Sequence, residues 1–166
     1  MISQGMQTPI AIAWRIRSRL ENIPYSALAL LARIAMALVF WTSGQTKIEG
    51  LALNPVTGEF QLGWPHVSDS AITLFRDEYR LPLLPPEWAA TLAALAEHAL
   101  PLLLVLGLAS RLGALGLLGM TAVIQLLVYP GAFVTHATWA TALLLIVARG
   151  PGRWSLDHWL MQRVNH

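Results

Sequence analysis

The sequence has 166 residues, of which 55% are hydrophobic and only 12% are charged, and its mean hydropathy is +0.54. A soluble domain usually carries about 25% charged residues, so this composition indicates a single domain embedded in lipid. The net charge of +2 is small and the arginines are scattered, which argues against a nucleic-acid partner. Cysteine is absent, which excludes disulfides, thiolate metal sites and a thiol–disulfide relay carried by this chain alone.

Four segments are as apolar and as long as a transmembrane helix, which needs roughly 20 residues. A soluble bundle would need a polar face on each helix, and the second and third segments have none. The sequence therefore predicts an all-α integral membrane four-helix bundle that forms a single transmembrane domain over residues 1–166. The predicted spans cover about residues 25–48, 87–109, 111–130 and 132–147.

Basic residues predict the orientation of the bundle, because cytoplasmic loops of membrane proteins carry an excess of lysine and arginine. The rule places both termini in the cytoplasm, with an outer loop at residues 49–86 and a cytoplasmic tail at residues 148–166. The arginines assigned to the cytoplasmic side are Arg15, Arg17, Arg19, Arg111, Arg149, Arg153 and Arg163.

Two short helices are expected outside the spans. In the outer loop, "NPVTGEFQLGWPH" is turn-rich, and "VSDSAITLFRDEYRLPLLPP" predicts an amphipathic helix with Phe75, Tyr79 and Leu83 on its apolar side. This helix is interpreted as a strap in the membrane interface or as a lid over the bundle. After the fourth span, "GPGRWSLDHWL" predicts a short C-terminal interfacial helix capped by Ser155, with Asp157 and His158 as cap and surface residues.

Glu97 and His98 interrupt the apolar second span in the stretch "LAALAEHALP". Adjacent residues on a helix point about 100° apart, whereas paired metal ligands lie three or four residues apart, so no metal site is predicted. Pro101 has no N–H group, which leaves the carbonyl of Glu97 without its helical hydrogen bond. Unpaired polar groups inside a membrane cost several kcal/mol each, so a partner or a ligand is expected here. The candidate intramembrane polar site consists of Arg33, Glu97, His98 and Pro101.

Arg33 in the first span is one candidate partner for Glu97. At 1.5 Å per residue, Arg33 lies about 9 Å and Glu97 about 16 Å from the inner boundary, and an arginine side chain covers most of that difference. The alternative is that Arg33 extends to the cytoplasmic interface, as long basic side chains do. The sequence is consistent with both.

A second set of polar and aromatic residues lies in the outer half of the first, third and fourth spans. One interpretation is a ligand pocket with aromatic walls, hydrogen-bonding groups and a histidine that moves a proton. The other is ordinary membrane architecture, with interfacial aromatic residues and hydrogen bonds between helices. The candidate outer pocket consists of Trp41, Ser43, Gln45, Lys47, Gln125, Tyr129, His136 and Trp139.

Several stretches resemble the DoxX family of four-helix bacterial inner-membrane proteins, and the likeness covers most of residues 31–159. They are "RIAMALVFWTSGQTKI", "LFRDEYRLPLLPPEWAA", "AEHALPLLLVLGLASRLGALGLL" and "ARGPGRWSLDH". The family takes its name from a subunit of a thiosulfate:quinone oxidoreductase, and relatives are described as parts of membrane oxidoreductase complexes. This branch resembles members encoded beside small metal-buffering peptides. The resemblance transfers no catalytic residue. The positions that match its polar pattern are Arg33, Ser43, Lys47, Glu97, Arg111 and His136.

The sequence and the resemblance lead to three functional hypotheses. The first is a non-catalytic or quinone-interacting subunit of a membrane redox system, in which His136, Gln125 and Glu97 handle the oxygens and protons of a quinone. Since the sequence offers no ligand set for haem or an iron–sulfur cluster, a protein partner in the membrane would supply the electron-transfer cofactor. The second hypothesis is an assembly or processing helper, or a scaffold, for a partner protein. A small-molecule or metal transporter ranks last.

Overall fold

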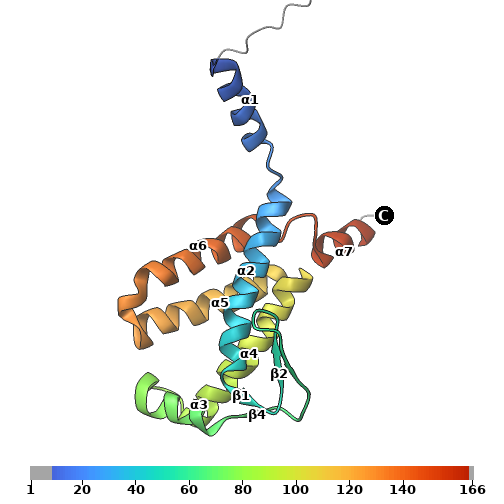
Figure 1. Cartoon of the computed structure of the whole chain (residues 1–166). Coiled ribbons are helices and arrows are strands. Elements are labelled where there is room, and N and C mark those ends of the chain that lie inside the picture. The colour runs from blue at the N-terminus through green and yellow to red at the C-terminus, as the bar shows by residue number, and fades with distance from the viewer. Residues whose placement is uncertain (1–8, 165–166) are drawn as a thin grey trace, which may run out of the picture.

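The computed structural model describes residues 9–164 and shows a bundle of long helices (Figure 1). Within these residues, four helical segments are long and apolar enough to cross a membrane, which confirms the predicted all-α membrane bundle. The predicted domain also included residues 1–8 and 165–166, which lie outside the described residues. The four segments are α2 (Tyr25–Gln45), α4 (Pro86–Leu106), α5 (Ser110–Val123) with a π-helical turn to Val128, and α6 (Phe133–Arg149), which follows a 3₁₀ turn (Pro130–Ala132).

The four helices close a ring around one apolar core. Helix α2 packs against α4 and α6, and α5 packs against the same two helices. The outward faces expose many leucine, isoleucine and valine side chains, which fits contact with lipid. The buried core consists of Met36, Ala37, Phe40, Leu104, Ala114, Leu117, Leu143 and Ile146.

Proline and glycine set the ends of the helices that carry the site. Pro24 precedes α2 in an extended conformation, and α4 begins with Pro86 at its first position, where a missing N–H group costs nothing. Helix α4 ends at Gly107, whose φ of +70° lies in the left-handed region that glycine tolerates. A Cβ atom at Gly107 would also come within 2.7 Å of Nη2 of Arg33. The turn between α4 and α5 therefore requires glycine.

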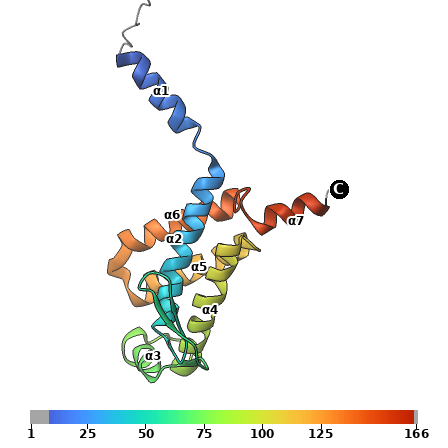
Figure 2. The same cartoon turned by 45° about the vertical axis from the view of Figure 1, so that its right-hand side comes forward.

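The outer loop contains short strands that the sequence analysis did not predict. Strand β1 (Ile48–Glu49) pairs antiparallel with β4 (His66–Val67), and β2 (Ala52–Asn54) pairs antiparallel with β3 (Glu59–Gln61). The chain from β1 to β4 is thus one long hairpin. The part formed by β2 and β3 folds back along α2 and α4, as Figures 1 and 2 show.

The predicted amphipathic helix of the outer loop is shorter than expected. It consists of α3 (Asp69–Leu74), capped by Ser68, and a π-helical turn (Phe75–Tyr79). Phe75 is buried against Ala89 and Ala90 of α4, and Tyr79 packs beside it. Leu83 is 90% exposed, so its predicted place on the apolar side is wrong. The chain leaves the helical conformation at Arg80, three residues earlier, where φ is +43°.

Both described ends of the chain lie at the same end of the bundle, opposite to α3, β1 and β4 (Figures 1 and 2). Helix α1 (Pro9–Glu21), which was not predicted, extends away from the bundle. The predicted C-terminal helix is present as α7 (Leu156–Val164). Ser155 caps it as expected, because its Oγ accepts a hydrogen bond from the backbone N–H of His158 at 3.2 Å.

Candidate functional site

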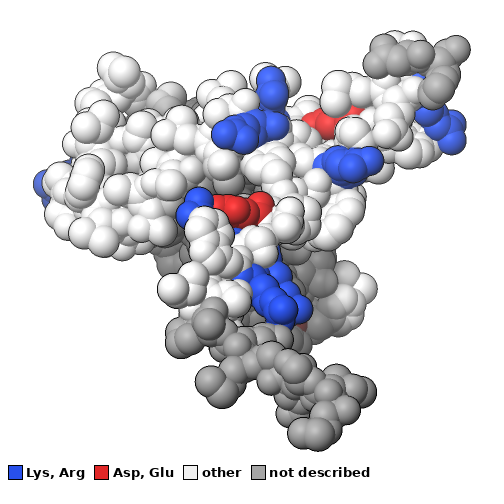
Figure 3. All heavy atoms as spheres, turned by 90° about the horizontal axis from the view of Figure 1, so that it is seen from above, with Lys and Arg blue, Asp and Glu red and all other residues white. Residues whose placement is uncertain are grey.

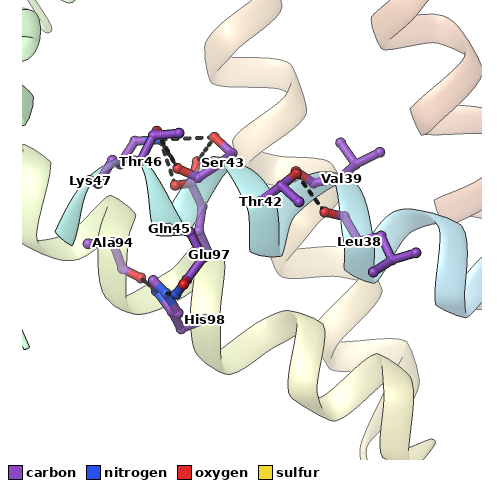
Figure 4. A network of polar contacts seen from close by, with 10 residues as sticks. All are labelled: Leu38, Val39, Thr42, Ser43, Gln45, Thr46, Lys47, Ala94, Glu97 and His98. Atoms are coloured by element: carbon purple, nitrogen blue, oxygen red, sulfur yellow. Dashed lines mark hydrogen bonds and ion pairs between the residues drawn. The ribbon is translucent and has the colours of Figure 1, made fainter. Parts of the chain in front are cut away.

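A buried ion pair between Lys47 and Glu97 joins the C-terminal end of α2 to α4. Nζ of Lys47 lies 2.6 Å from Oε2 of Glu97, and the two side chains are only 6% and 4% exposed. Ser43 links them: its hydroxyl donates to Oε1 of Glu97 at 3.1 Å and accepts from Nζ of Lys47 at 2.9 Å (Figure 4). Nζ also donates to the carbonyl oxygen of Ser43 at 3.2 Å. Nζ of Lys47 therefore has three oxygen neighbours. Oε2 of Glu97 meets it in the ion pair but accepts no hydrogen bond among the described residues.

Gly44 makes this pairing possible, because it lets α2 approach α4 closely. A Cβ atom at position 44 would lie 2.8 Å from Cε1 of His98 and 3.0 Å from Cβ of Glu97. Real side chains do not come that close to each other, so a larger residue would push the two helices apart. Ser43 therefore supplies a hydroxyl partner for Glu97, and Gly44 leaves the space that α4 needs to approach α2 at Glu97.

His98 lies on a different side of α4 and holds the strand hairpin rather than the ion pair. Its Nδ1–H group donates to the carbonyl of Ala94 at 2.6 Å, and its Nε2 accepts from the amide of Gln45 at 2.8 Å. Gln45 accepts in turn from the backbone N–H of Leu53 at 2.6 Å, and Trp41 donates to the carbonyl of Leu53 at 2.5 Å. The ring of Trp41 also contacts that of His98 edge-on, at 4.9 Å between centroids.

A cavity of about 400 Å³ opens beside the ion pair, between α2, α4, α5, α6 and the helix of the outer loop. Its walls are mostly apolar and aromatic, with polar groups at a few places. The polar and aromatic residues that line it are Ser43, Lys47, Glu97, His136, Tyr129, Tyr79, Phe40, Phe75 and Trp139.

His136 brings to the cavity a ring nitrogen with no hydrogen-bond partner among the described residues. Its Nδ1 lies 2.7 Å from Oε1 of Gln125, and the amide N–H of Gln125 donates to the carbonyl of Pro130 at 2.7 Å. Because the second contact fixes the orientation of the Gln125 amide, Nδ1 of His136 carries the proton in the neutral ring. Nε2 is then an acceptor, and no described residue contacts it. The ring of Trp139 packs beside that of His136, with centroids 5.1 Å apart.

Two tyrosines and a glutamate stand where the cavity meets the outer loop. The hydroxyl of Tyr129 donates to Oε1 of Glu78, and the rings of Tyr79 and Tyr129 meet edge-on at 5.7 Å. The hydrogen bond to Glu78 raises the pKa of Tyr129, and burial raises the pKa of Tyr79. Both phenols are therefore neutral at physiological pH. These contacts tie the helix of the outer loop to the end of α5.

Arg33 does not contact Glu97, and it does not extend into solvent either. It is 1% exposed and donates four hydrogen bonds to backbone carbonyls. Two of the acceptors, Leu104 and Val105, belong to the last turn of α4, where free carbonyls give the helix end a negative partial charge. The other two, Pro151 and Trp154, precede α7. Asp157 completes this inner junction by accepting from the N–H groups of Ala109 and Ser110, at the start of α5.

The predicted residues thus separate into three groups. Ser43, Lys47, Tyr129, His136 and Trp139 line one cavity with Glu97, and Gln125 supports His136 from behind. Trp41, Gln45 and His98 hold the hairpin, and Pro101 lines a different cavity beneath that hairpin, within a continuous α4. Arg33 belongs to the inner junction. Sequence reasoning missed Gly44, although a residue without a side chain next to Ser43 was a usable signal of close helix packing.

The site has an acceptor nitrogen, a close buried ion pair and aromatic walls, which suits an apolar ligand with a hydroxyl group. Within residues 9–164, no three histidine, aspartate or glutamate side chains lie close enough together to hold a metal ion.

The fold and the cavity define a multi-pass membrane protein with a four-helix bundle. A family model described as DoxX matches residues 28–130, which is more than half of the chain, and the protein belongs to the DoxX family. The matched range includes Arg33, the ion pair and most of the cavity wall, and it ends before His136. No match was found among curated proteins or among solved structures.

Proposed function

We propose that the cavity beside Lys47 and Glu97 binds a quinone, and that the protein is the quinone-interacting subunit of a membrane redox system. In this proposal the chain lies in the bacterial inner membrane with both termini in the cytoplasm, and the cavity opens on the opposite side. The observation that carries the proposal is the acceptor Nε2 of His136 in a cavity whose walls are mostly apolar and aromatic.

The size and walls of the cavity support a ring-shaped apolar ligand. About 400 Å³ lies within the range of small-molecule sites, which are mostly apolar with a few placed polar groups. Phe40, Trp139 and Tyr79 supply flat surfaces for a planar ring.

The polar groups would act on the reduced form of the ligand. A quinone supplies the electron-transfer chemistry that the side chains of this chain lack. Nε2 of His136 would accept a hydrogen bond from one hydroxyl group of the reduced ligand, and the imidazole would take up that proton while Nδ1–H stays bonded to Gln125. The proton of the second hydroxyl group would pass to water. Lys47 and Glu97 neutralise each other's charge, so they would shape the polar end of the cavity and leave the proton to His136. A partner protein would accept the electrons.

The test is the quinone content of protein purified from native membranes, measured by extraction and mass spectrometry. We expect bound quinone in the wild type and a loss of about tenfold or more in His136→Ala, with a smaller loss in Glu97→Gln. His66→Ala is the matched control, since this histidine lies in the exposed outer loop. Quinone-free wild-type protein, or equal content in all variants, would refute the proposal.

A second candidate function, a membrane scaffold for a partner protein, is supported by the hairpin. Its apolar side chains Val56, Phe60, Leu62 and Trp64 are all more than two-thirds exposed. Affinity purification from native membranes separates the two candidates. A stoichiometric partner without a redox centre would favour the scaffold, and a partner that carries one would favour the quinone-interacting subunit.

A further inference from the structure

We propose that a basic groove at the inner end of the bundle binds a phosphate group, supplied by an anionic phospholipid or by a soluble phosphate. The groove is lined by Arg111, Arg149 and Arg153. It lies at the end opposite to the quinone cavity, and neither its residues nor its ligand enter the proposed function.

Four parts of the fold converge to form this groove. Its walls are the start of α2, the turn between α4 and α5, the segment after α6, and α7. It encloses about 800 Å³, which is room for a headgroup as well as a phosphate. Tyr25 fixes one wall, because its hydroxyl donates to the carbonyl of Gly150 at 2.6 Å, and Ser26 fixes another by accepting from the N–H of Arg153 at 3.0 Å.

The three arginines have no acidic partner among the described residues. Asp157 is the acidic side chain among the described residues that line the groove, and it is already engaged. Its two oxygens accept from the N–H groups of Ala109 and Ser110, at 2.7 and 2.9 Å, and its charge acts on the buried Arg33. The described ion pairs of the chain include none of Arg111, Arg149 and Arg153. Three uncompensated guanidinium groups on one cavity therefore create a strong local attraction for an anion.

The chemistry of guanidinium favours phosphate as that anion. Arginine presents a planar fork of N–H donors that matches phosphate oxygens with two parallel hydrogen bonds. The arginine side chains approach from three different elements: the first turn of α5, the last turn of α6 and the loop before α7. A tetrahedral phosphate can receive donors from several directions at once, whereas a planar carboxylate cannot use them all.

The position of the groove favours a lipid as the source of the phosphate. It lies where the spans that begin at Tyr25 and end at Arg149 meet the headgroup region. Leu112, Leu160 and Met161 line the groove and are more than 40% exposed, which gives acyl chains an apolar surface beside the arginines. Trp154 and Trp159, both exposed, mark the same interface. Seen from this end, basic side chains outnumber acidic ones (Figure 3).

The test uses the full chain in detergent and counts bound lipid by native mass spectrometry. Phosphatidylglycerol and phosphatidylcholine with identical acyl chains are titrated in parallel, and inorganic phosphate is titrated separately by thermal shift. The groove variant carries Arg111→Gln, Arg149→Gln and Arg153→Gln. The matched control carries Arg15→Gln, Arg17→Gln and Arg19→Gln, which removes the same charge from α1, outside the groove.

We expect phosphatidylglycerol to bind the wild type and the control at least about tenfold more tightly than the groove variant, since each basic residue near a membrane contributes to anionic lipid binding. Phosphatidylcholine should show a smaller difference. Inorganic phosphate that stabilises the wild type but not the groove variant, without preferential lipid binding, would support the site with a soluble source. Equal losses in the groove variant and the control would overturn the proposal, as would no loss in either. If the triple variant does not fold, the same lipid titration is made with Arg153→Gln alone, because this residue lies in an exposed loop.

Discussion

Nζ of Lys47 and Oε2 of Glu97 form an ion pair 2.6 Å long that is almost completely buried between α2 and α4. Removing one partner of such a pair leaves a buried charge without compensation, which costs about 3–5 kcal/mol. We therefore expect Lys47→Met to lower the free energy of unfolding in detergent by that amount. The double variant Lys47→Met, Glu97→Leu should lie closer to the wild type, because no charge then remains buried.

The exposed pair of Arg17 and Glu21 provides the control for this prediction. Its charged atoms are 2.7 Å apart, close to the separation in the buried pair, but both side chains are more than 60% exposed on α1. Arg17→Gln should leave the unfolding transition almost unchanged. A double variant at positions 47 and 97 that is less stable than Lys47→Met would contradict the interpretation.

Gly44 should tolerate no larger side chain. Because a Cβ atom would meet both Glu97 and His98 within 3.0 Å, Gly44→Ala is expected to cost about 1–3 kcal/mol of stability by forcing the helices apart. Gly119 on α5 is the control, since a Cβ atom there meets no atom within 4 Å. Gly119→Ala should keep or raise the stability, because alanine favours a helix by roughly 1 kcal/mol over glycine. Equal unfolding midpoints for the two variants would contradict this prediction.

Hydropathy alone was sufficient to predict the bundle, because each span must be long and apolar whatever its neighbours are. It also singled out Glu97, since a carboxyl within an apolar helix needs a partner. The partner was harder to predict. Counting the helical rise from each boundary assumes that all spans end at the same depth in the membrane. On that assumption Lys47 lies at the outer boundary, away from Glu97. In the structure Gly44, near the end of α2, lies against Glu97 and His98 in the middle of α4.

The strands and α1 were not predicted because their sequence patterns are weak. The strands from Ala52 to Gln61 are three residues long, and their pairing depends on anchoring to Trp41 and Gln45 rather than on their own pattern. Helix α1 mixes arginines with apolar residues and is too short for a span. The role of Arg33 required the positions of four carbonyls from two distant segments, which no sequence spacing reveals.

Arg33 should hold the inner junction together through these carbonyls. Arg33→Met removes four hydrogen bonds from a charged donor, each of which contributes about 1.5–3 kcal/mol, so we expect a loss of at least about 3 kcal/mol. Arg33→Lys should recover only part of that loss, because a lysine lacks the planar fork. Hydrogen exchange should rise at residues 105–110 and 151–157 in both variants. Arg163→Gln, on the exposed face of α7, should leave exchange there unchanged.

The tyrosines at the mouth of the cavity predict how stability depends on pH. Their pKa values are raised, Tyr129 by its hydrogen bond to Glu78 and Tyr79 by burial, whereas an unfolded tyrosine titrates near pH 10. Their contribution to stability is therefore fully present below about pH 10 and is lost as the pH rises from there through the higher folded-state values. Between about pH 9 and about pH 11, on either side of the pKa of an unfolded tyrosine, the variant Tyr79→Phe, Tyr129→Phe should lose less stability than the wild type. Parallel curves for variant and wild type would exclude this mechanism.

Gln125 should determine which nitrogen of His136 carries the proton. Its amide donates to Pro130, so its oxygen is left to accept from Nδ1, and Nε2 of this cavity-lining histidine is then an acceptor. Nitrogen-15 NMR distinguishes the two neutral tautomers, and the His136 signal is assigned by its loss in His136→Ala. We expect the Nδ1–H form in the wild type. Gln125→Leu removes the acceptor, so the ring should shift toward the Nε2–H form that free imidazole side chains favour. Gln125→Glu retains an acceptor and should restore the Nδ1–H form. A wild-type signal of the Nε2–H form, or the same tautomer in Gln125→Leu, would show that Gln125 does not position this ring.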